Sequence, residues 1–151
     1  MADAYAIQLA QAVQAALDAA ELSMPITVIR AYRPRRDLKD LADPLLTVAP
    51  HAIEIERESR GGNSHEYQVD VAVQQKLVES TPEEDTDQRI EQADALMRLV
   101  EEVADWALPL VLTSPVARCL RVSNEPAFSP QHWDEYGLFT SVLQIVFKCT
   151  R

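Results

Sequence analysis

Glycine, histidine and cysteine are all scarce in this chain of 151 residues, and each scarcity argues against one kind of site. With only three glycines, the chain lacks the glycine-rich loop that binds phosphate in nucleotide-binding proteins. The three histidines, His51, His65 and His132, have no metal-ligand spacing with one another or with a cysteine. We therefore expect the protein to work without a metal or any other cofactor.

The two cysteines, Cys119 and Cys149, lie in apolar segments, where a thiol behaves as a small buried hydrophobe. We expect both to stay free, as in proteins made in a reducing cytoplasm. The sequence has no Gly-x-Ser-x-Gly turn to present a nucleophilic serine. A nucleophile–base pair of Cys119 with His132 is disfavoured, because Cys119 lies in a strand-like run between Arg118 and Leu120. We predict that the chain is not an enzyme.

Basic residues are also few, 14 against 24 acidic residues, which gives a formal net charge of −10. An acidic surface repels phosphate backbones, so we expect no sequence-specific nucleic-acid partner. The N-terminal residues lack the basic start and apolar run of a signal peptide, and no apolar stretch approaches the roughly 18 residues that span a bilayer. We expect a soluble protein without a membrane partner, folded as a single domain over residues 1–151.

Hydrophobic periodicity predicts two amphipathic helices, one over residues 2 to about 22 and one over about 86 to 107. Pro44 and Pro50 bracket a short apolar piece that suits an edge strand, since proline cannot donate to a sheet ladder. The other predictions are strands over residues 26–32, 45–48, 116–122 and 138–149, and an aromatic-bearing loop over residues 124–137.

The clearest pattern in the sequence is a long alternating β-hairpin. Isoleucines alternate with glutamates in residues 51–58, and Tyr67 and valines alternate with mostly polar residues in residues 67–74. The segment between them contains two glycines and an asparagine, which tolerate positive φ, so we predict an antiparallel turn there. The predicted buried face holds Ile53, Ile55, Tyr67, Val69, Val71 and Val73, and the predicted outward face holds Glu54, Glu56, Gln68, Asp70 and Gln74.

This order of elements predicts an α+β fold: a mostly antiparallel sheet with a long β-hairpin, an N-terminal helix and a second helix packed on one face. The outward side of the hairpin is acidic, whereas five of the 14 basic residues fall within residues 30–39. An acidic face and a basic loop on one chain are self-complementary, as the contacts in a ring of identical subunits require. The candidate interface residues are Arg33, Arg35, Arg36, Lys39, Glu54, Glu56 and Arg60.

The assembled order resembles the tail terminator and related neck or tail-completion proteins of long-tailed bacteriophages. The resembling pieces are ITVIRAYRPRRDLKDL, the hairpin IEIERESRGGNSHEYQVDVAVQQKL, the helix ALMRLVEEVADWAL and the final strand SVLQIVFKCTR. The resemblance implies a homohexameric ring at the head-proximal end of the tail tube, which stops tube polymerisation and joins the neck. It also implies that the hairpin extends toward neighbouring subunits. The implied partners are further copies of the chain, the tail tube protein and a neck or head-completion protein, in a virion assembled in the host cytoplasm.

Other interpretations of the same pattern remain open. Another head–tail joining or neck protein would show much the same order of elements. A small enzyme would form its site between subunits and use His51, His65 or Cys119. A non-viral adaptor would bind its partner by strand addition at the exposed edge of the hairpin.

Overall fold

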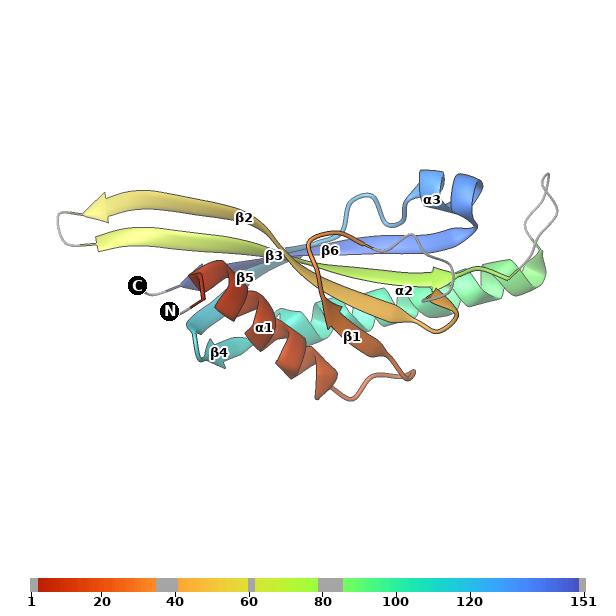
Figure 1. The fold of residues 1–151 in the computed structure, drawn as a ribbon, viewed down its shortest axis with the longest axis horizontal. Helices are drawn as coiled ribbons and strands as arrows, with labels where there is room; N and C mark the ends of the chain where they lie inside the picture. Colours follow the sequence, from red (N-terminus) through yellow and green to blue (C-terminus); the bar gives the residue numbers. More distant parts are fainter. Residues whose placement is uncertain (1–2, 35–40, 60–61, 79–85, 150–151) are drawn as a thin grey trace.

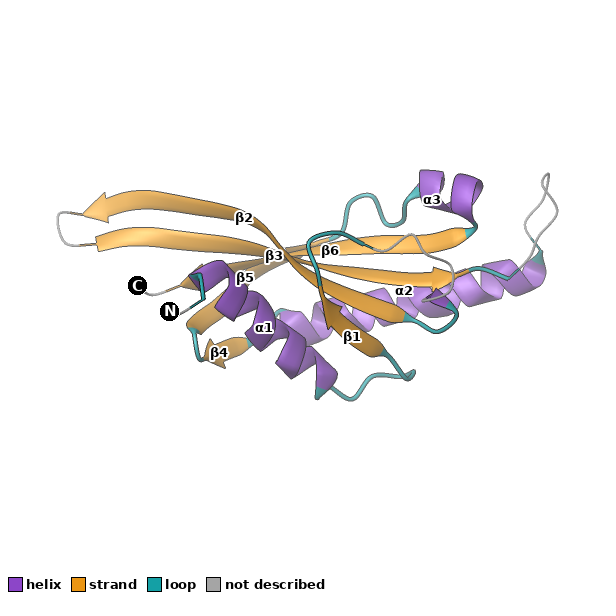
Figure 2. Cartoon of the chain, viewed as in Figure 1, coloured by secondary structure: helices purple, strands orange, loops and turns teal. Residues whose placement is uncertain are grey.

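The computed structural model describes residues 3–34, 41–59, 62–78 and 86–149. Within these ranges, one six-stranded sheet in the order β1-β2-β3-β6-β5-β4 carries the helices (Figures 1 and 2). Neighbouring strands are antiparallel, except that β1 runs parallel to β2. The α+β prediction is confirmed. The bounds are α1 Tyr5–Asp18, β1 Thr27–Arg30, β2 Leu45–Ser59, β3 Gly62–Lys76, α2 Asp87–Ala107, β4 Val111–Thr113, β5 Val116–Ser123, α3 Pro130–Tyr136 and β6 Leu138–Cys149.

Helix α1 is the predicted N-terminal helix, although it is shorter at both ends than the predicted range. Its alanines and glutamines favour the helical backbone, and one apolar stripe faces the sheet. At its N-terminal end the Tyr5 ring centroid lies 5.0 Å from that of Tyr67 in β3. The Tyr5 hydroxyl also donates a hydrogen bond of 2.8 Å to the carbonyl of Val116 in β5. These contacts fix the start of α1 across the middle of the sheet.

Strands β2 and β3 form the predicted hairpin, and each is 15 residues long. The predicted separate edge strand at residues 45–48 is wrong, because these residues begin β2 and lie between β1 and β3. Pro50 is tolerated because β1 ends opposite Val48 and a bulge at His51 follows. The bulge shifts the helix-facing side of β2 from even-numbered residues such as Val48 to odd-numbered ones such as Ile53.

Strand β6 lies between β3 and β5 and covers the residues predicted for it, 138–149. In its C-terminal half, the side chains predicted to share one face, Leu143, Ile145, Phe147 and Cys149, are all buried, and Val146 on the other face is buried as well. Strand β5 pairs only with this C-terminal half. The short strand β4, which was not predicted, pairs with the start of β5 and forms that edge of the sheet.

The part of the β6 edge that β5 leaves open is covered by the segment that follows β5. Asn124 Nδ2 donates to the carbonyl of Val142 at 2.8 Å, and the Ser129 N–H donates to the carbonyl of Thr140 at 2.8 Å. An uncovered strand edge is a template for unwanted pairing, so these bonds protect the edge. They also hold α3 against this end of β6.

Helix α2 begins as predicted near residue 86. The Thr86 hydroxyl accepts a hydrogen bond of 3.2 Å from the Arg89 N–H, which makes Thr86 the N-cap. The sequence also contains a pattern like a capping box, Thr81-Pro82-Glu83-Glu84, as an alternative helix start, but it lies outside the described residues. The helix ends at Ala107, two residues before Pro109, also as predicted.

Helix α3 contradicts the prediction that residues 124–137 are a loop. The Ser129 hydroxyl accepts from the His132 N–H at 3.3 Å, and Pro130 occupies the first turn. Gly137 ends the helix with φ at 61°, the left-handed conformation that favours glycine. Helix start and stop signals were therefore present in the sequence, but the segment between them is only two turns long.

The main core lies between the sheet and helices α1 and α2, which cover the same face. Ser23, after α1, donates its hydroxyl to Glu102 of α2 at 2.8 Å and so ties the two helices together. We call the opposite side of the sheet the outer face. At the α3 end of this face, Gln74 is fully buried and donates from Nε2 to Thr140 Oγ1 at 3.1 Å. The prediction that Gln74 points into solvent is wrong, because α3 covers this part of the outer face.

Candidate assembly surfaces

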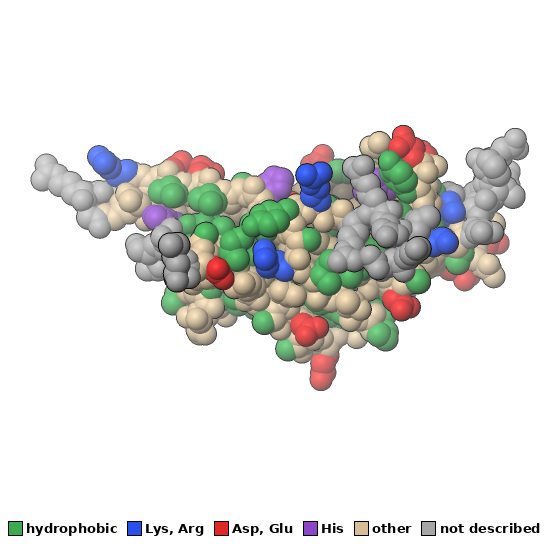
Figure 3. All heavy atoms as spheres, viewed as in Figure 1, with side chains coloured by type: hydrophobic (Ala, Val, Ile, Leu, Met, Phe, Trp, Pro, Cys, Tyr) green, Lys and Arg blue, Asp and Glu red, His purple; other side chains and the backbone are tan. Residues whose placement is uncertain are grey.

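The hairpin extends beyond the helix layer at the left of Figure 1, and we call this outer half, residues 52–57 of β2 with the facing part of β3, the arm. Ile53 and Ile55 lie on the helix-facing side of the arm, yet they are 57% and 54% exposed. Exposed hydrophobic side chains are visible on this part of the surface in Figure 3. The prediction that both isoleucines are buried is wrong. The helix layer ends at Tyr5, which packs on Tyr67 and leaves the isoleucines uncovered.

One edge of the arm is also unpaired. Strand β1 pairs with β2 only up to Arg30 opposite Val48, and one further bond joins the Ala31 N–H to the Val48 carbonyl at 3.0 Å. Beyond this point, no strand among the described residues pairs with the outer edge of β2. As far as the described residues show, the arm therefore presents free backbone donors and acceptors next to its exposed isoleucines.

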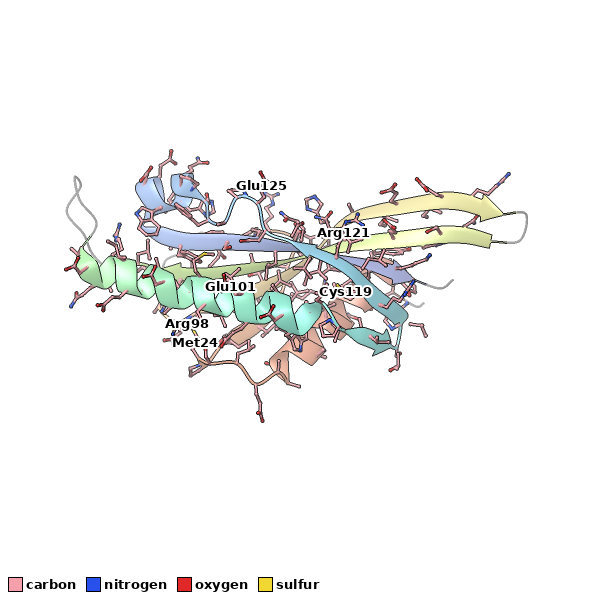
Figure 4. All side chains as sticks on the ribbon, turned by 180° about the vertical axis from the view of Figure 1, so that it is seen from behind. Met24, Arg98, Glu101, Cys119, Arg121 and Glu125 are labelled. Atoms are coloured by element: carbon pink, nitrogen blue, oxygen red, sulfur yellow. The ribbon has the colours of Figure 1, made fainter. Side chains whose placement is uncertain are left out.

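Glu54 and Glu56 lie on the outer-face side of the arm and are exposed, as predicted. Glu54 is directly opposite Glu66 of β3. Like charges in this position repel each other, and the Arg121 guanidinium, 3.8 Å from the Glu66 carboxylate, partly relieves the repulsion. Figure 4 shows Arg121 on β5, next to the base of the arm. The acidic side of the hairpin is therefore partly compensated from a neighbouring strand.

The outer face as a whole is divided by charge rather than uniformly acidic. Its acidic residues lie on β2 and β3, whereas Arg118 and Arg121 on β5 and Lys148 on β6 lie on the same face across the sheet. Lys148 is opposite both Glu66 and Arg118 in the two ladders that it joins. These three basic residues were missed as a group. Each occupies an alternate position of a predicted strand, but only the pairing of β5 with β6 brings them together.

The basic loop is only partly described. Arg33 follows β1 and is exposed. Nearby, the Arg30 guanidinium lies 5.9 Å from the ring centroid of Tyr32, which is 68% exposed. Among the described residues, Arg33 makes no ion pair with Glu54 or Glu56. The other predicted basic interface residues, Arg35, Arg36, Lys39 and Arg60, lie outside the described residues.

A groove of about 420 Å³ lies between α2 and α3, at the end of the molecule away from the arm. Its wall on α2 consists of residues one turn apart, because Ile90, Ala93, Asp94 and Met97 share one side of the helix. The opposite wall and floor are Phe128, Pro130, Trp133, Asp134 and Phe139. Its volume lies within the range of about 300–1,000 Å³ that is usual for binding pockets.

The groove is apolar with an acidic rim. The Phe128 and Trp133 ring centroids are 5.4 Å apart, and the Arg89 guanidinium lies 5.9 Å from the Trp133 ring. Ile90 is 46% and Phe128 38% exposed, so apolar surface is open to solvent. The exposed residues Asp94 and Asp134 supply the acidic rim. The sequence did not predict the groove, because its walls meet only where α3 folds over the edge of β6.

The two hairpin histidines do not face each other. His51, at the bulge, has its Nδ1 2.7 Å from an Asp70 carboxylate oxygen. His65 is instead opposite Ile55 on the helix-facing side. The structure does not bring them together as one site.

Cys119 and His132 are also separate. Cys119 is opposite Phe147 on the helix-facing side of the sheet, whereas the His132 Nδ1 lies 2.7 Å from Thr140 Oγ1 on the outer face. Their respective neighbours in β6, Phe147 and Thr140, are seven positions apart, which corresponds to about 23 Å along the strand. Burial raises the pKa of the Cys119 thiol above its ordinary value, an effect that a backbone hydrogen bond at Arg121 partly offsets. The pair does not form a nucleophile and its base.

Among the described residues, no three His, Cys, Asp or Glu side chains are grouped so that they would hold a metal ion. None of the helices in the described ranges has both the length and the apolarity to cross a membrane. No protein-family model matches the sequence. A search of curated proteins likewise finds no significant match.

Proposed function

We propose that the protein is a structural subunit that assembles into a homo-oligomeric ring, as a tail terminator of a long-tailed bacteriophage. The observation that carries the proposal is the arm, where Ile53 and Ile55 are more than half exposed beside an unpaired strand edge. Exposed apolar side chains next to a free edge are a liability in an isolated subunit. Contact with a neighbouring copy removes both features from water.

The chain also has the charge pattern that ring contacts need. A heterologous contact joins two different surfaces of identical subunits, and it forms a ring when the rotation closes. The exposed Glu54 and Glu56 on the arm and the basic residues Arg33, Arg35 and Arg36 are of opposite charge. In the proposed ring these groups attract each other across subunits. The proposed role is mechanical rather than catalytic.

In this role the ring closes the head-proximal end of the tail tube and joins it to the neck, within the virion, after assembly in the host cytoplasm. Its partners are the tail tube protein and a neck or head-completion protein. The same features suit another head–tail joining protein, which would form a ring without stopping tube growth. A measurement of tube growth therefore distinguishes a tail terminator from another head–tail joining protein.

The test combines light scattering with electron microscopy. A hexamer has about six times the subunit mass of 16.9 kDa, roughly 100 kDa. We expect this hexamer either free in solution or as a ring at one end of a tail tube, where it stops further growth. The tube protein encoded in the same genome is the substrate for this assay. A monomer at every concentration, together with tubes that stay bare and continue to grow, would contradict the proposal.

A second candidate, an adaptor that binds another protein by strand addition, is favoured only by the free edge of β2. An adaptor would use the backbone of that edge and would not need self-association. Light scattering together with electron microscopy of tail tubes separates the two functions, because an adaptor stays monomeric in solution and also forms no ring on tubes.

A further inference from the structure

We infer that the helix-facing side of the arm of one copy docks in the groove between α2 and α3 of the next copy. The inference rests on the proposed function, since it requires that the chain assemble with itself. It specifies which two surfaces meet. Both surfaces are built from described residues, and neither is occupied by another part of the described chain.

The two surfaces match in polarity. The arm presents two isoleucines, Ile53 and Ile55, on one side of an extended strand. The groove has an apolar lining, with Ile90 and Phe128 open to solvent at its mouth. Docking removes apolar area of both from water at once, and each Å² buried contributes about 25 cal/mol. A strand fits a groove along a helix because its side chains on one face are spaced regularly.

The two surfaces also match in charge. Arg57 is exposed and lies on the same side of the arm as Ile55, two residues further along the strand. The rim of the groove carries Asp94 and Asp134. Glu54 and Glu56 point to the other side of the arm, so docking does not bring them against the acidic rim. Complementary charges of this kind fix the orientation and suppress alternative contacts.

The positions of the two surfaces allow copies to join head to tail. The arm lies at one end of the long axis of the molecule, and α3 and the start of α2, which line the groove, lie toward the other end (Figure 1). A copy whose arm is docked therefore keeps its own groove free for a third copy. Such head-to-tail contacts form a ring when the rotation between successive copies brings the last groove to the first arm. An arm–arm contact would join the same surface of two copies and would stop at a dimer.

The experiment uses two disabled variants of the full chain. The arm variant is Ile53→Ser with Ile55→Ser, and the groove variant is Ile90→Lys with Asp94→Arg. All four side chains are exposed, so folding should survive, and circular dichroism checks it. We expect each variant alone to be monomeric under conditions where the wild type forms rings. A mixture of the two retains one working contact, so it should give a one-to-one dimer and nothing larger.

A matched control removes exposed hydrophobic residues elsewhere. Val111 and Val116, at the β4 edge, are 68% and 56% exposed. The variant Val111→Ser with Val116→Ser should form rings as the wild type does. Rings formed equally well by the arm variant, or a mixture that stays monomeric, would overturn the docking inference and leave the proposed ring function standing.

Cross-linking tests the docking even if the wild type forms no ring. The variant Ile55→Cys with Asp94→Cys, in a Cys119→Ser background, places one new thiol on each surface. Oxidation of a concentrated solution should give a ladder of disulfide-linked oligomers. Either single cysteine, without the other, should give no ladder, and an Ile55→Cys dimer would indicate an arm–arm contact instead. Absence of the ladder in the double variant would overturn the inference.

Discussion

Ile53 and Tyr67 are directly opposite each other in the β2–β3 ladder, yet Ile53 is 57% exposed and Tyr67 only 3%. Both side chains point to the helix-facing side of the sheet. The difference arises because the Tyr5 ring of α1 packs on Tyr67, with ring centroids 5.0 Å apart, and the helix layer ends there. The edge of the helix layer therefore runs between two paired residues at the base of the arm.

This boundary predicts unequal effects of two similar substitutions on the stability of the monomer. Tyr67→Ala leaves a cavity under Tyr5 and should lower the free energy of unfolding by about 3 kcal/mol. Ile53→Ala removes a side chain that is already mostly in water, so it should cost less than about 1 kcal/mol. Urea unfolding at a concentration where both variants are monomeric measures the difference. Equal losses would show that the arm is part of the packed body.

Local signals in the sequence predicted most of the fold. Strict alternation predicted the hairpin and β6, and apolar periodicity predicted α2. Pro50 misled the prediction, because a proline in a strand is tolerated where the neighbouring strand has ended and a bulge follows. Helix α3 was missed although Ser129 and Gly137 mark its two ends.

Burial and the candidate surfaces were less predictable, because they depend on which layer covers which residue. Alternation correctly placed Ile53 and Gln74 on opposite faces, but it assigned burial to the wrong one. Gln74 is buried because α3 packs over it, and Ile53 is exposed because α1 does not reach it. The groove at Ile90 and Trp133 needed the same tertiary information. Sequence periodicity gives the face of a strand, not the element that packs on it.

The buried pair Gln74 and Thr140 gives a second prediction. Thr140→Val removes an oxygen that accepts a hydrogen bond from Gln74 Nε2 and that lies 2.7 Å from His132 Nδ1. The loss of a buried hydrogen bond costs about 1–3 kcal/mol, so the free energy of unfolding should fall by about that amount. Thr140→Ser keeps the hydroxyl and serves as the control, with a smaller loss. Thermal unfolding of the two variants decides whether the hydrogen bond or the methyl group matters more.

The end of α3 gives a third prediction. Gly137 has a φ of 61°, and a Cβ built there would meet only Arg89 Nη2, at 3.8 Å. The cost of Gly137→Ala is therefore a backbone cost, about 1–2 kcal/mol, without a steric clash. Gly137→Asn should cost less, since asparagine tolerates this conformation better. If both variants unfold at the wild-type temperature, the left-handed conformation is not required at this position.

The raised pKa of Cys119 gives a prediction about pH. Only the thiolate reacts with iodoacetamide, so Cys119 in the folded protein should react more slowly at pH 8 than it does in urea. The rate should increase as pH rises toward the raised pKa. Since the folded state disfavours the thiolate, the stability contributed by the neutral thiol is complete below the unfolded pKa of about 8.5 and is lost as pH rises through the folded pKa. The Cys119→Ser variant shows how much of the signal comes from Cys149. A folded rate equal to that in urea would contradict the effect of burial.

The last prediction concerns the basic loop and the acidic side of the arm. If Arg35 and Arg36 attract Glu54 and Glu56 of a neighbouring copy, then Arg35→Glu with Arg36→Glu replaces attraction by repulsion and should weaken the ring. Exposed pairs are screened over about 8 Å at physiological ionic strength, so added salt should weaken the wild-type ring and strengthen that of the variant. Reversal of two other exposed cations, Lys76→Glu with Arg98→Glu, makes the same change in net charge and is the control. Light scattering across a salt series measures the dissociation of each ring. Equal weakening by the control would mean that net charge governs the contact, and unchanged assembly of the Arg35→Glu, Arg36→Glu variant would mean that this pairing does not hold the ring together.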